Sequence, residues 1–223
     1  MSADNPVQTS AIQTVFIVDD DASFLNSLAR FLRAAGYHVE TFDSAQSFLD
    51  RLSPEQMGCV VTDLQMPDLN GLELQAALSN NTNPLPVIFL SGQGDIPSTV
   101  RAMRKGAEDF LTKLAPKEEL LAAVQRALAR AEHERRQRER LRELRRLFSS
   151  LSERELEVLG HVVRGKLNKQ IAADLGINER TVKLHRTAIT RKLGLQSVAE
   201  LTRLTAEAGI FPDVPPEVFS EHS

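Results

Sequence analysis

The chain has 223 residues, a length that suits two domains of ordinary size, each able to bury its own core. Hydrophobic residues make up 42% and charged residues 26%, the balance of a soluble globular protein. No apolar run approaches the roughly 20 residues of a membrane span, and the start MSADNPVQTS has no signal-peptide pattern. We therefore expect a cytoplasmic protein with no membrane contact. The single cysteine, Cys59, excludes an intramolecular disulfide and a cysteine-rich zinc site.

The net charge of −3 conceals three regions of different charge. Residues 1–128 hold 9 Lys and Arg against 16 Asp and Glu, residues 129–146 hold 8 against 4, and residues 147–223 hold 10 against 10. An acidic front half, a basic joint and a balanced back half indicate parts with separate tasks.

Five short apolar runs alternate with amphipathic segments over the first 112 residues. The runs are residues 14–18, 38–42, 59–62, 86–90 and 109–112. They are rich in β-branched and aromatic residues, and the segments between them carry apolar residues at helical spacing. This alternation predicts an α/β domain with a doubly wound, five-stranded parallel sheet. In that architecture, functional groups gather beyond the carboxyl ends of the strands.

The pattern turns helical at about Ala115, and no strand signal follows. Residues 132–140 lose the apolar stripe, which predicts a solvated helical linker. A weak heptad through Leu141, Leu144 and Phe148 leaves open the alternative that the linker dimerises as a coil.

A small all-α domain is predicted beyond the linker. The sequence SERE at residues 152–155 is a capping box that opens a first helix. On a later helix, over residues 179–193, the inward face would consist of Val182, His185, Ile189 and Leu193. The opposite face would carry Arg180, Lys183, Leu184, Thr187 and Arg191. No acidic residue interrupts the run from Arg180 to Lys192, which suits insertion into the major groove of DNA.

Acidic and basic side chains stand at the ends of the predicted strands. They are Asp19, Asp20 and Asp21 after the first strand, Asp63 after the third, Ser91 after the fourth and Lys113 after the fifth. Parallel strands would bring these groups to one edge, where neighbouring carboxylates repel and attract a hard divalent ion, Mg²⁺ or Mn²⁺. One carboxylate could then attack a phosphorus centre, while the ion, the lysine and the hydroxyl bind phosphoryl oxygens. Asp21 or Ser23 could instead only cap a helix.

Two families use this chemistry at a strand edge. A phosphohydrolase of the haloacid dehalogenase type would need the Asp-x-Asp pattern that Asp19 and Asp21 can supply. It would also need an acidic motif after the lysine, where only helices are predicted. The stretches FIVDDD, VVTDLQMPDLNG, VIFLSGQGD and GAEDFLTK instead resemble, in order, the four signatures of the receiver domain of two-component response regulators. The stretch GQGDIPSTVRAMRKGAEDF is particularly similar to the FixJ branch.

The receiver resemblance covers about residues 14–128 and implies a CheY-like or flavodoxin-like fold. It implies that Asp63 accepts the phosphoryl group from a sensor histidine kinase. The implied metal ligands are Asp19, Asp20, Asp63 and the backbone carbonyl of Gln65. Ser91 would sense the phosphoryl group, Lys113 would pair with it, and Phe110 would be the aromatic switch residue.

A second resemblance, over about residues 148–210, is to the helix-turn-helix domain of the LuxR/NarL/FixJ type. It is carried by the stretch LSERELEVLGHVVRGKLNKQIAADLGINERTVKLHRTAITRKLG. Lys183 and Thr187, with Leu184 against a thymine methyl, are the residues that we expect to read base edges. Lys169, Arg186 and Lys192 are expected to bind phosphates. A helical interaction bundle is the alternative for this domain.

Together the resemblances imply a transcription regulator rather than an enzyme. The expected parts are a loosely ordered start (1–12), a receiver (13–128), a helical linker (129–147), a helix-turn-helix domain (148–212) and a tail (213–223). Phosphorylation of Asp63 would switch dimerisation on the fourth helix and fifth strand, so that two copies read two-fold half-sites in double-stranded DNA. RNA polymerase is a further candidate partner. A receiver that signals without phosphate is the nearer alternative.

Leu114 departs from the receiver pattern, which usually has a proline, commonly after a cis peptide bond, at this position. A cis bond between Lys113 and Leu114 would cost about 3 to 4 kcal/mol, whereas a proline lowers this cost to under about 1 kcal/mol. We therefore predict a trans bond and a rerouted loop. Phosphorylation would be retained, with an altered lifetime or altered switching.

Overall fold

The computed structural model describes residues 13–53, 55–80, 84–92, 96–195 and 197–211. The chain divides into two compact units, residues 1–135 and 136–223. Among the described residues, no helix is both long enough and apolar enough to cross a membrane.

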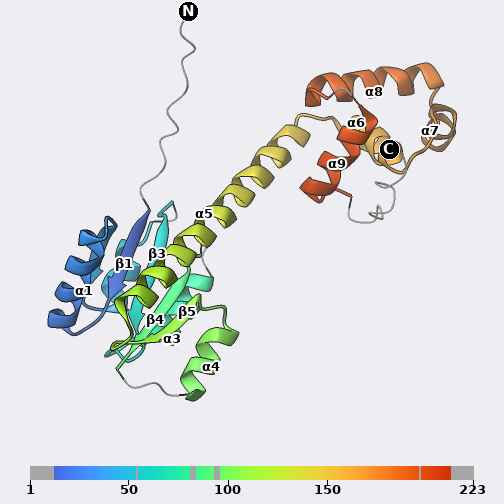
Figure 1. Cartoon of the computed structure of the whole chain (residues 1–223). Coiled ribbons are helices and arrows are strands. Elements are labelled where there is room, and N and C mark those ends of the chain that lie inside the picture. The colour runs from blue at the N-terminus through green and yellow to red at the C-terminus, as the bar shows by residue number, and fades with distance from the viewer. Residues whose placement is uncertain (1–12, 54, 81–83, 93–95, 196, 212–223) are drawn as a thin grey trace, which may run out of the picture. The chain divides into compact units, whose positions relative to one another are not determined.

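The first unit is a five-stranded parallel sheet in the order β2-β1-β3-β4-β5 (Figure 1). Its strands are β1 (Thr14–Val18), β2 (His38–Phe42), β3 (Gly58–Asp63), β4 (Val87–Ser91) and β5 (Asp109–Thr112). The helices between them are α1 (Ala22–Ala34), α2 (Ala45–Arg51), α3 (Gly71–Ser79) and α4 (Ile96–Arg104). The α/β fold predicted from the alternating runs is confirmed.

Apolar side chains cover both faces of this sheet. On one face, alternate residues of β1, β3 and β4 pack with α1 and the first half of α5 (Lys117–Phe148). On the other face, the intervening residues pack with α2, α3 and α4 around the rings of Phe16, Phe48 and Phe89. The central strands are therefore buried on both sides, and their polar groups emerge only at the strand ends.

Gly71 is the first residue of α3 and packs closely against the end of β3. A Cβ atom at this position would collide with the backbone oxygen of Asp63 and with the ring of Phe89. Because a packed core resists added volume, Gly71→Ala is expected to destabilise the protein by about 1 to 3 kcal/mol. Urea unfolding measures this loss. Gly92→Ala is the matched control, since a Cβ at Gly92 meets nothing within 4 Å, and equal loss in both variants would contradict the prediction.

The second unit is all-helical over its described residues. After α5 it contains α6 (Glu153–Val163), α7 (Asn168–Leu175), α8 (Glu179–Leu193) and α9 (Val198–Ala208). The predicted capping box is present: Ser152 N donates to Glu155 Oε2 at 2.7 Å, and Glu155 N donates to Ser152 Oγ at 3.3 Å. Val182, Ile189 and Leu193 of α8 are buried as predicted, while His185 is only half-buried.

The end of α5 contributes to the core of this second unit. Leu144 is 1% exposed and Phe148 is 3% exposed, and both pack with residues of α6 to α9. The coil read through Leu141, Leu144 and Phe148 would need these side chains on an open face. Two of the three are covered by their own chain, so this apolar stripe joins α5 to the helical core.

Candidate functional site

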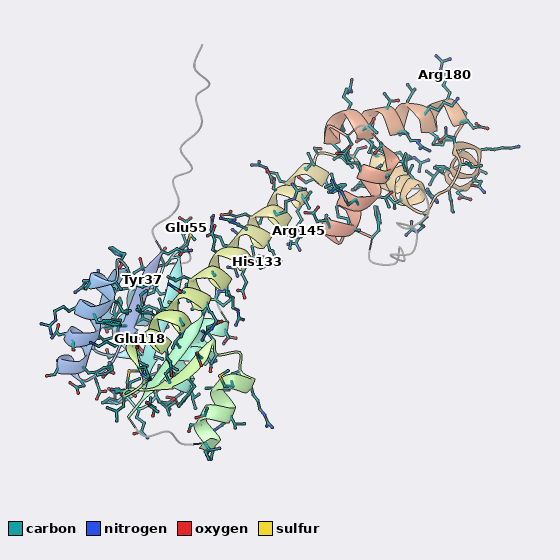
Figure 2. The ribbon with its side chains drawn as sticks, viewed as in Figure 1. Tyr37, Glu55, Glu118, His133, Arg145 and Arg180 are labelled. Carbon is teal, nitrogen blue, oxygen red and sulfur yellow. The ribbon has the colours of Figure 1, made fainter. Side chains whose placement is uncertain are left out.

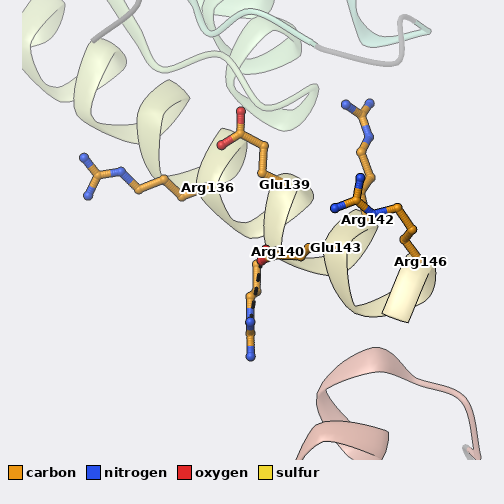
Figure 3. A pocket seen from close by; sticks show the side chains of 6 residues that line it. All are labelled: Arg136, Glu139, Arg140, Arg142, Glu143 and Arg146. Carbon is orange, nitrogen blue, oxygen red and sulfur yellow. Dashed lines mark ion pairs between the residues drawn. The ribbon is translucent and has the colours of Figure 1, made fainter. Parts of the chain in front are cut away.

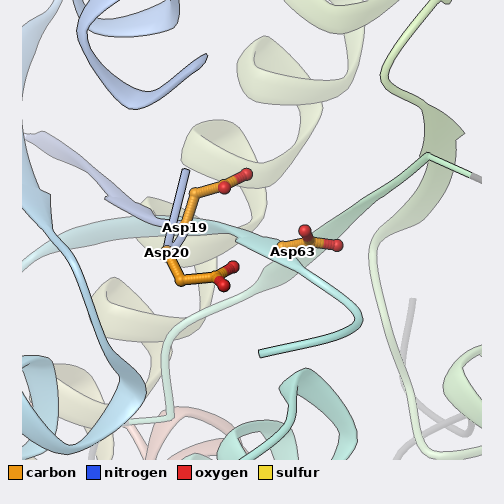
Figure 4. A group of neighbouring side chains, drawn as sticks. All are labelled: Asp19, Asp20 and Asp63. Carbon is orange, nitrogen blue, oxygen red and sulfur yellow. The ribbon is translucent and has the colours of Figure 1, made fainter. Parts of the chain in front are cut away.

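Three carboxylates meet at the carboxyl edge of the sheet (Figure 4). Asp19 and Asp20 follow β1 directly, and Asp63 is the last residue of β3, the neighbouring strand. One carboxylate oxygen from each lies within 4.8 Å of the others. Asp21 does not belong to this cluster, because it is the N-cap of α1 and accepts hydrogen bonds from Ser23 N and Phe24 N.

Lys113 bridges two of these carboxylates. Its Nζ atom lies 2.7 Å from Asp19 Oδ2 and 2.7 Å from Asp63 Oδ2. The backbone N–H of Lys113 donates to the Ser91 carbonyl at 2.8 Å, which fixes the start of this side chain beside the end of β4. The ring of Phe24 also lies close to Lys113, with its centre 4.5 Å from Nζ.

Burial and ion pairing compete in this cluster. Burial lowers the pKa of Lys113, but its hydrogen bonds to Asp19 and Asp63 outweigh burial and leave the pKa raised. Burial raises the pKa of Asp19 by more than the hydrogen bond from Lys113 lowers it. The lysine therefore stays protonated, and the carboxylates around it still gain from a further cation.

The other predicted receiver residues lie on adjoining strands or in the adjoining loop. Ser91 ends β4 and is buried, beside Thr112 of β5. Phe110 of β5 is half-buried and stacks on Phe89, with ring centres 6.0 Å apart. Gln65 follows β3, and its backbone N–H donates to Asp63 Oδ1 at 3.2 Å. The carboxyl edge of the sheet thus brings the acidic residues, Ser91 and Lys113 close together, whereas Phe110 lies within β5.

The outward face of α8 carries the side chains predicted to contact DNA. The side chains of Arg180, Lys183, Leu184, Thr187 and Arg191 are all exposed, and Leu184 is 64% exposed. Arg180 extends away from the start of the helix (Figure 2). Lys169, at the start of α7, is also exposed.

Two predicted phosphate-binding residues are already engaged inside the helical unit. Lys192 Nζ lies 2.6 Å from Glu155 Oε2 and 3.2 Å from the Ser150 carbonyl. Arg186 donates from a terminal nitrogen to Asn168 Oδ1 at 2.9 Å. A phosphate contact by Lys192 would have to compete with its ion pair, whereas Arg186 keeps further donors.

Comparisons with known proteins cover both units. Residues 15–125 match the response regulator receiver domain, and residues 149–205 match the luxR family of bacterial regulatory proteins. The response regulator protein TodT of Pseudomonas putida is 44% identical over 191 residues, 86% of this chain and 84% of TodT. The chain belongs to the LuxR-type response regulators.

Two further relatives agree with this family. The transcriptional regulatory protein FixJ of Bradyrhizobium diazoefficiens is 37% identical over 199 residues, 89% of this chain and 97% of FixJ. The solved structure of the response regulator StyR has a TM-score of 0.81 and 47% identity, covering 88% of this chain and all of that chain. Response regulators of this kind are DNA-binding transcription regulators that work with a sensor kinase. The comparisons therefore exclude the phosphohydrolase that the sequence had left as an alternative.

In this response regulator Lys113 contacts Asp19 and Asp63 although the residue that follows it is Leu114 and not proline. The bond between Lys113 and Leu114 is trans, as predicted, since no cis peptide occurs among the described residues. Ala115 N donates to the Thr112 carbonyl at 2.9 Å, which closes a tight turn around the two residues. Leu114 is 92% exposed at the tip of this turn. A trans turn is thus compatible with the lysine contacts at Asp19 and Asp63.

Phe24 and Glu155 are residues of this response regulator whose contacts were not foreseen. Phe24 lies against Lys113, and Glu155 holds Lys192. The capping box identified Glu155 as a helix-start residue, but nothing in its neighbourhood indicated a lysine 37 positions later. An apolar residue in the first turn of α1, close to Asp19 and Asp20, was the available sign for Phe24.

Glu155 gives the helical unit a pH-dependent stability. The hydrogen bond from Lys192, aided by the Ser152 backbone, holds the pKa of Glu155 below its ordinary value. A carboxylate with a lowered pKa stabilises the fold above its unfolded pKa, and this stability is lost as the pH falls through the folded pKa. Glu155→Gln should therefore lower the melting temperature at pH 7 by roughly 2 to 6 °C and lower it less at about pH 4, below the ordinary pKa of glutamate.

Circular dichroism melts at the two pH values measure this difference. Glu153→Gln is the matched control, because Glu153 begins the same helix and is exposed. A melting temperature that Glu155→Gln lowers equally at both pH values would contradict the role given to the charge of Glu155.

Proposed function

We propose that a sensor histidine kinase phosphorylates Asp63 and thereby switches transcriptional control through the helix-turn-helix domain. The observation that carries this proposal is the contact of Lys113 Nζ with both Asp63 and Asp19 at 2.7 Å, at the edge where Ser91 also lies. A lysine so placed can neutralise a phosphoryl oxygen that Asp63 carries. The Asp63 oxygen attacks phosphorus, and the bond from phosphorus to the donor group breaks.

The acidic cluster fits a hard divalent ion. Asp19, Asp20 and Asp63 supply carboxylate oxygens, the ligands that Mg²⁺ prefers, and the carbonyl of Gln65 would add another oxygen. Mn²⁺ accepts the same ligands. When bound, the ion would neutralise negative charge on the phosphoryl group. Asp63 is 9% exposed, so its carboxylate is accessible to a phosphodonor while its neighbours hold it in place.

The switch would pass from the sheet edge to the surface of α4 and β5. Ser91 would turn toward the phosphoryl group, and Phe110 would follow into the space beside it. On α4, Ile96, Val100 and Met103 are 77%, 43% and 45% exposed, at a spacing that places them on one face. A second phosphorylated copy would cover this apolar face and form a homodimer.

The dimer would present two α8 helices to paired half-sites in double-stranded DNA. Lys183, Leu184 and Thr187 would read base edges, while Arg180, Arg191 and Lys169 would bind phosphates. Arg186 and Lys192 would also bind phosphates, provided that DNA displaces the side chains that they contact within the helical unit. A DNA-bound regulator acts where the chromosome is, so we place it in the cytoplasm, with RNA polymerase as a further partner.

We further propose that residues 13–128 act as the receiver, 129–147 as the linker and 148–212 as the DNA-binding domain. Residues 1–12 and 213–223, assigned to a loosely ordered start and a tail, lie outside the described residues. The matches to the receiver and luxR families, at residues 15–125 and 149–205, support this division.

Treatment with acetyl phosphate and Mg²⁺, followed by mapping of the modified residue, tests the proposal. We expect one phosphoryl group on Asp63, a shift to dimer in sedimentation, and tighter binding to DNA. Asp63→Ala should lose all three responses, and Asp50→Ala, an exposed aspartate of α2, should keep them. Labelling of Asp19, or DNA binding and dimerisation that ignore the phosphodonor, would sink the proposal.

A further inference from the structure

The last turns of α5 hold the surplus positive charge of the helical unit. From Arg136 to Arg146 the helix contains six arginines and two glutamates. The remaining residues of the unit, 147–223, contain ten basic and ten acidic residues. The end of α5 is therefore the part of this unit with the largest excess of positive charge along the sequence.

Three of these arginines form no ion pair among the described residues. Arg142, Arg145 and Arg146 are exposed, and within the described part of the chain no hydrogen bond or ion pair engages their side chains. Arg140, by contrast, donates to Glu207 of α9 at 2.8 Å. Figure 2 shows Arg145 close to the end of α5.

Some arginines at the end of α5 share one side of the helix. Arg138, Arg142 and Arg146 follow one another at intervals of four residues, so they lie on one side of the helix, where like charges repel. Figure 3 shows Arg142 and Arg146 leaving the same side of α5, while Arg140 points to the opposite side. The two glutamates of this stretch, each three residues before an arginine, offset part of the repulsion, and an anion lying across this side would offset more of it.

These turns are held in a fixed position relative to the recognition helix. Leu144 and Phe148 are buried in the same core as Val182 and Ile189 of α8. The ion pair of Arg140 with Glu207 attaches the preceding turn to α9, and Lys192 of α8 donates to the Ser150 carbonyl just beyond α5. The arginines therefore keep their position relative to α8 when the receiver changes its conformation.

We propose that Arg142, Arg145 and Arg146 form a second DNA-binding surface, which contacts backbone phosphates beside the groove that α8 enters. Guanidinium groups bind phosphate oxygens with paired, charge-assisted hydrogen bonds. One helical turn separates Arg142 from Arg146, which lets each reach its own phosphate. Such contacts add affinity for every sequence and leave sequence choice to α8. DNA is the partner because the same rigid unit binds DNA and its other residues have balanced charge.

Salt dependence of DNA binding tests this surface in the full-length protein. The probe is a fluorescent duplex of about 30 base pairs with mixed sequence, titrated at several salt concentrations. If Arg142 and Arg146 each neutralise one phosphate, the double variant Arg142→Gln, Arg146→Gln should lower the slope of log K against log salt by about 1.8. At 0.15 M salt this corresponds to a roughly 30-fold weaker affinity.

Two control variants separate this effect from a change in net charge. Arg30→Gln with Arg51→Gln removes the same charge from exposed positions of α1 and α2 and should leave the salt slope unchanged. Arg142→Lys with Arg146→Lys should retain most of the slope, because lysine also binds phosphate as a point charge. Sedimentation of each variant checks that the oligomeric state is that of the wild type.

Equal salt slopes for the two glutamine variants would overturn the proposal. So would an altered oligomeric state in Arg142→Gln, Arg146→Gln, since the arginines would then act through assembly. Normal DNA affinity combined with lost transcription in a reconstituted assay would assign the surface to a protein partner and would equally overturn it.

Discussion

Replacement of Lys113 by alanine is expected to slow phosphorylation of Asp63 by about 100-fold or more. The lysine places one positive charge 2.7 Å from Asp63, where a phosphoryl group on Asp63 would gain negative charge. Removal of one such preorganised donor typically costs 10² to 10³ in rate. The loss also leaves Asp19, which is 1% exposed, facing Asp63 without the lysine ammonium between them. Time courses with radiolabelled acetyl phosphate and saturating Mg²⁺ measure the rate.

Lys117→Ala is the matched control for this prediction. Lys117 begins α5 four positions later, is exposed, and lies over the ring of Phe31 rather than at the acidic cluster. Its loss should leave the labelling rate unchanged. Lys113→Arg should give an intermediate rate, because the charge stays but the longer planar group cannot reproduce both contacts. If the Lys113→Ala variant is phosphorylated at the wild-type rate, the role assigned to the lysine is refuted.

Substitution of the outward residues of α8 should separate sequence reading from general affinity. Lys183→Ala or Thr187→Ala is expected to weaken binding to the preferred DNA sequence by about 1 to 3 kcal/mol, a factor of roughly 5 to 150. Binding to random DNA should fall far less in Thr187→Ala, whose hydroxyl carries no charge. Both side chains are exposed on the face opposite the buried Val182 and Ile189, so folding should not change.

The preferred sequence can be obtained by selection from a random duplex pool with the phosphorylated wild-type protein. Fluorescence titration against the selected and the random duplex then gives a specificity ratio for each variant. Arg191→Ala is the comparison, because a phosphate contact should weaken both duplexes to the same extent. A specificity ratio that Lys183→Ala and Thr187→Ala leave unchanged would contradict base reading by these residues.

The acidic site could be predicted because each of its parts is local. A strand is recognised from a few apolar residues, and parallel strands bring their carboxyl ends to one edge whatever the loops do. Asp63 and Lys113, 50 positions apart, therefore needed only the strand assignments to be placed together. The same holds for α8, where the spacing of Val182, Ile189 and Leu193 identifies the buried face.

Contacts that depend on tertiary packing could not be predicted in this way. The heptad through Leu144 and Phe148 shows that one side of α5 is apolar, but periodicity does not say which surface covers it. The pairing of Glu155 with Lys192 likewise requires α6 and α8 to be docked first. Leu114 gives the opposite case: energetics of the peptide bond predicted its trans geometry, although the course of the turn around it depends on Ala115 and Thr112.

The contribution of α5 to two separate cores indicates where this response regulator can be joined to parts of other proteins. Leu128 is the last residue of the helix in the receiver core, and Leu144 is the first in the helical core. A chimaera joined within residues 132–140 would preserve both apolar sets intact. A junction placed after Leu144 would remove Leu144 from the DNA-binding half. Because this side chain is 1% exposed, its loss would weaken the hydrophobic core of that half. The polar middle of α5 is therefore the natural exchange point for coupling this DNA-binding domain to a receiver with another input.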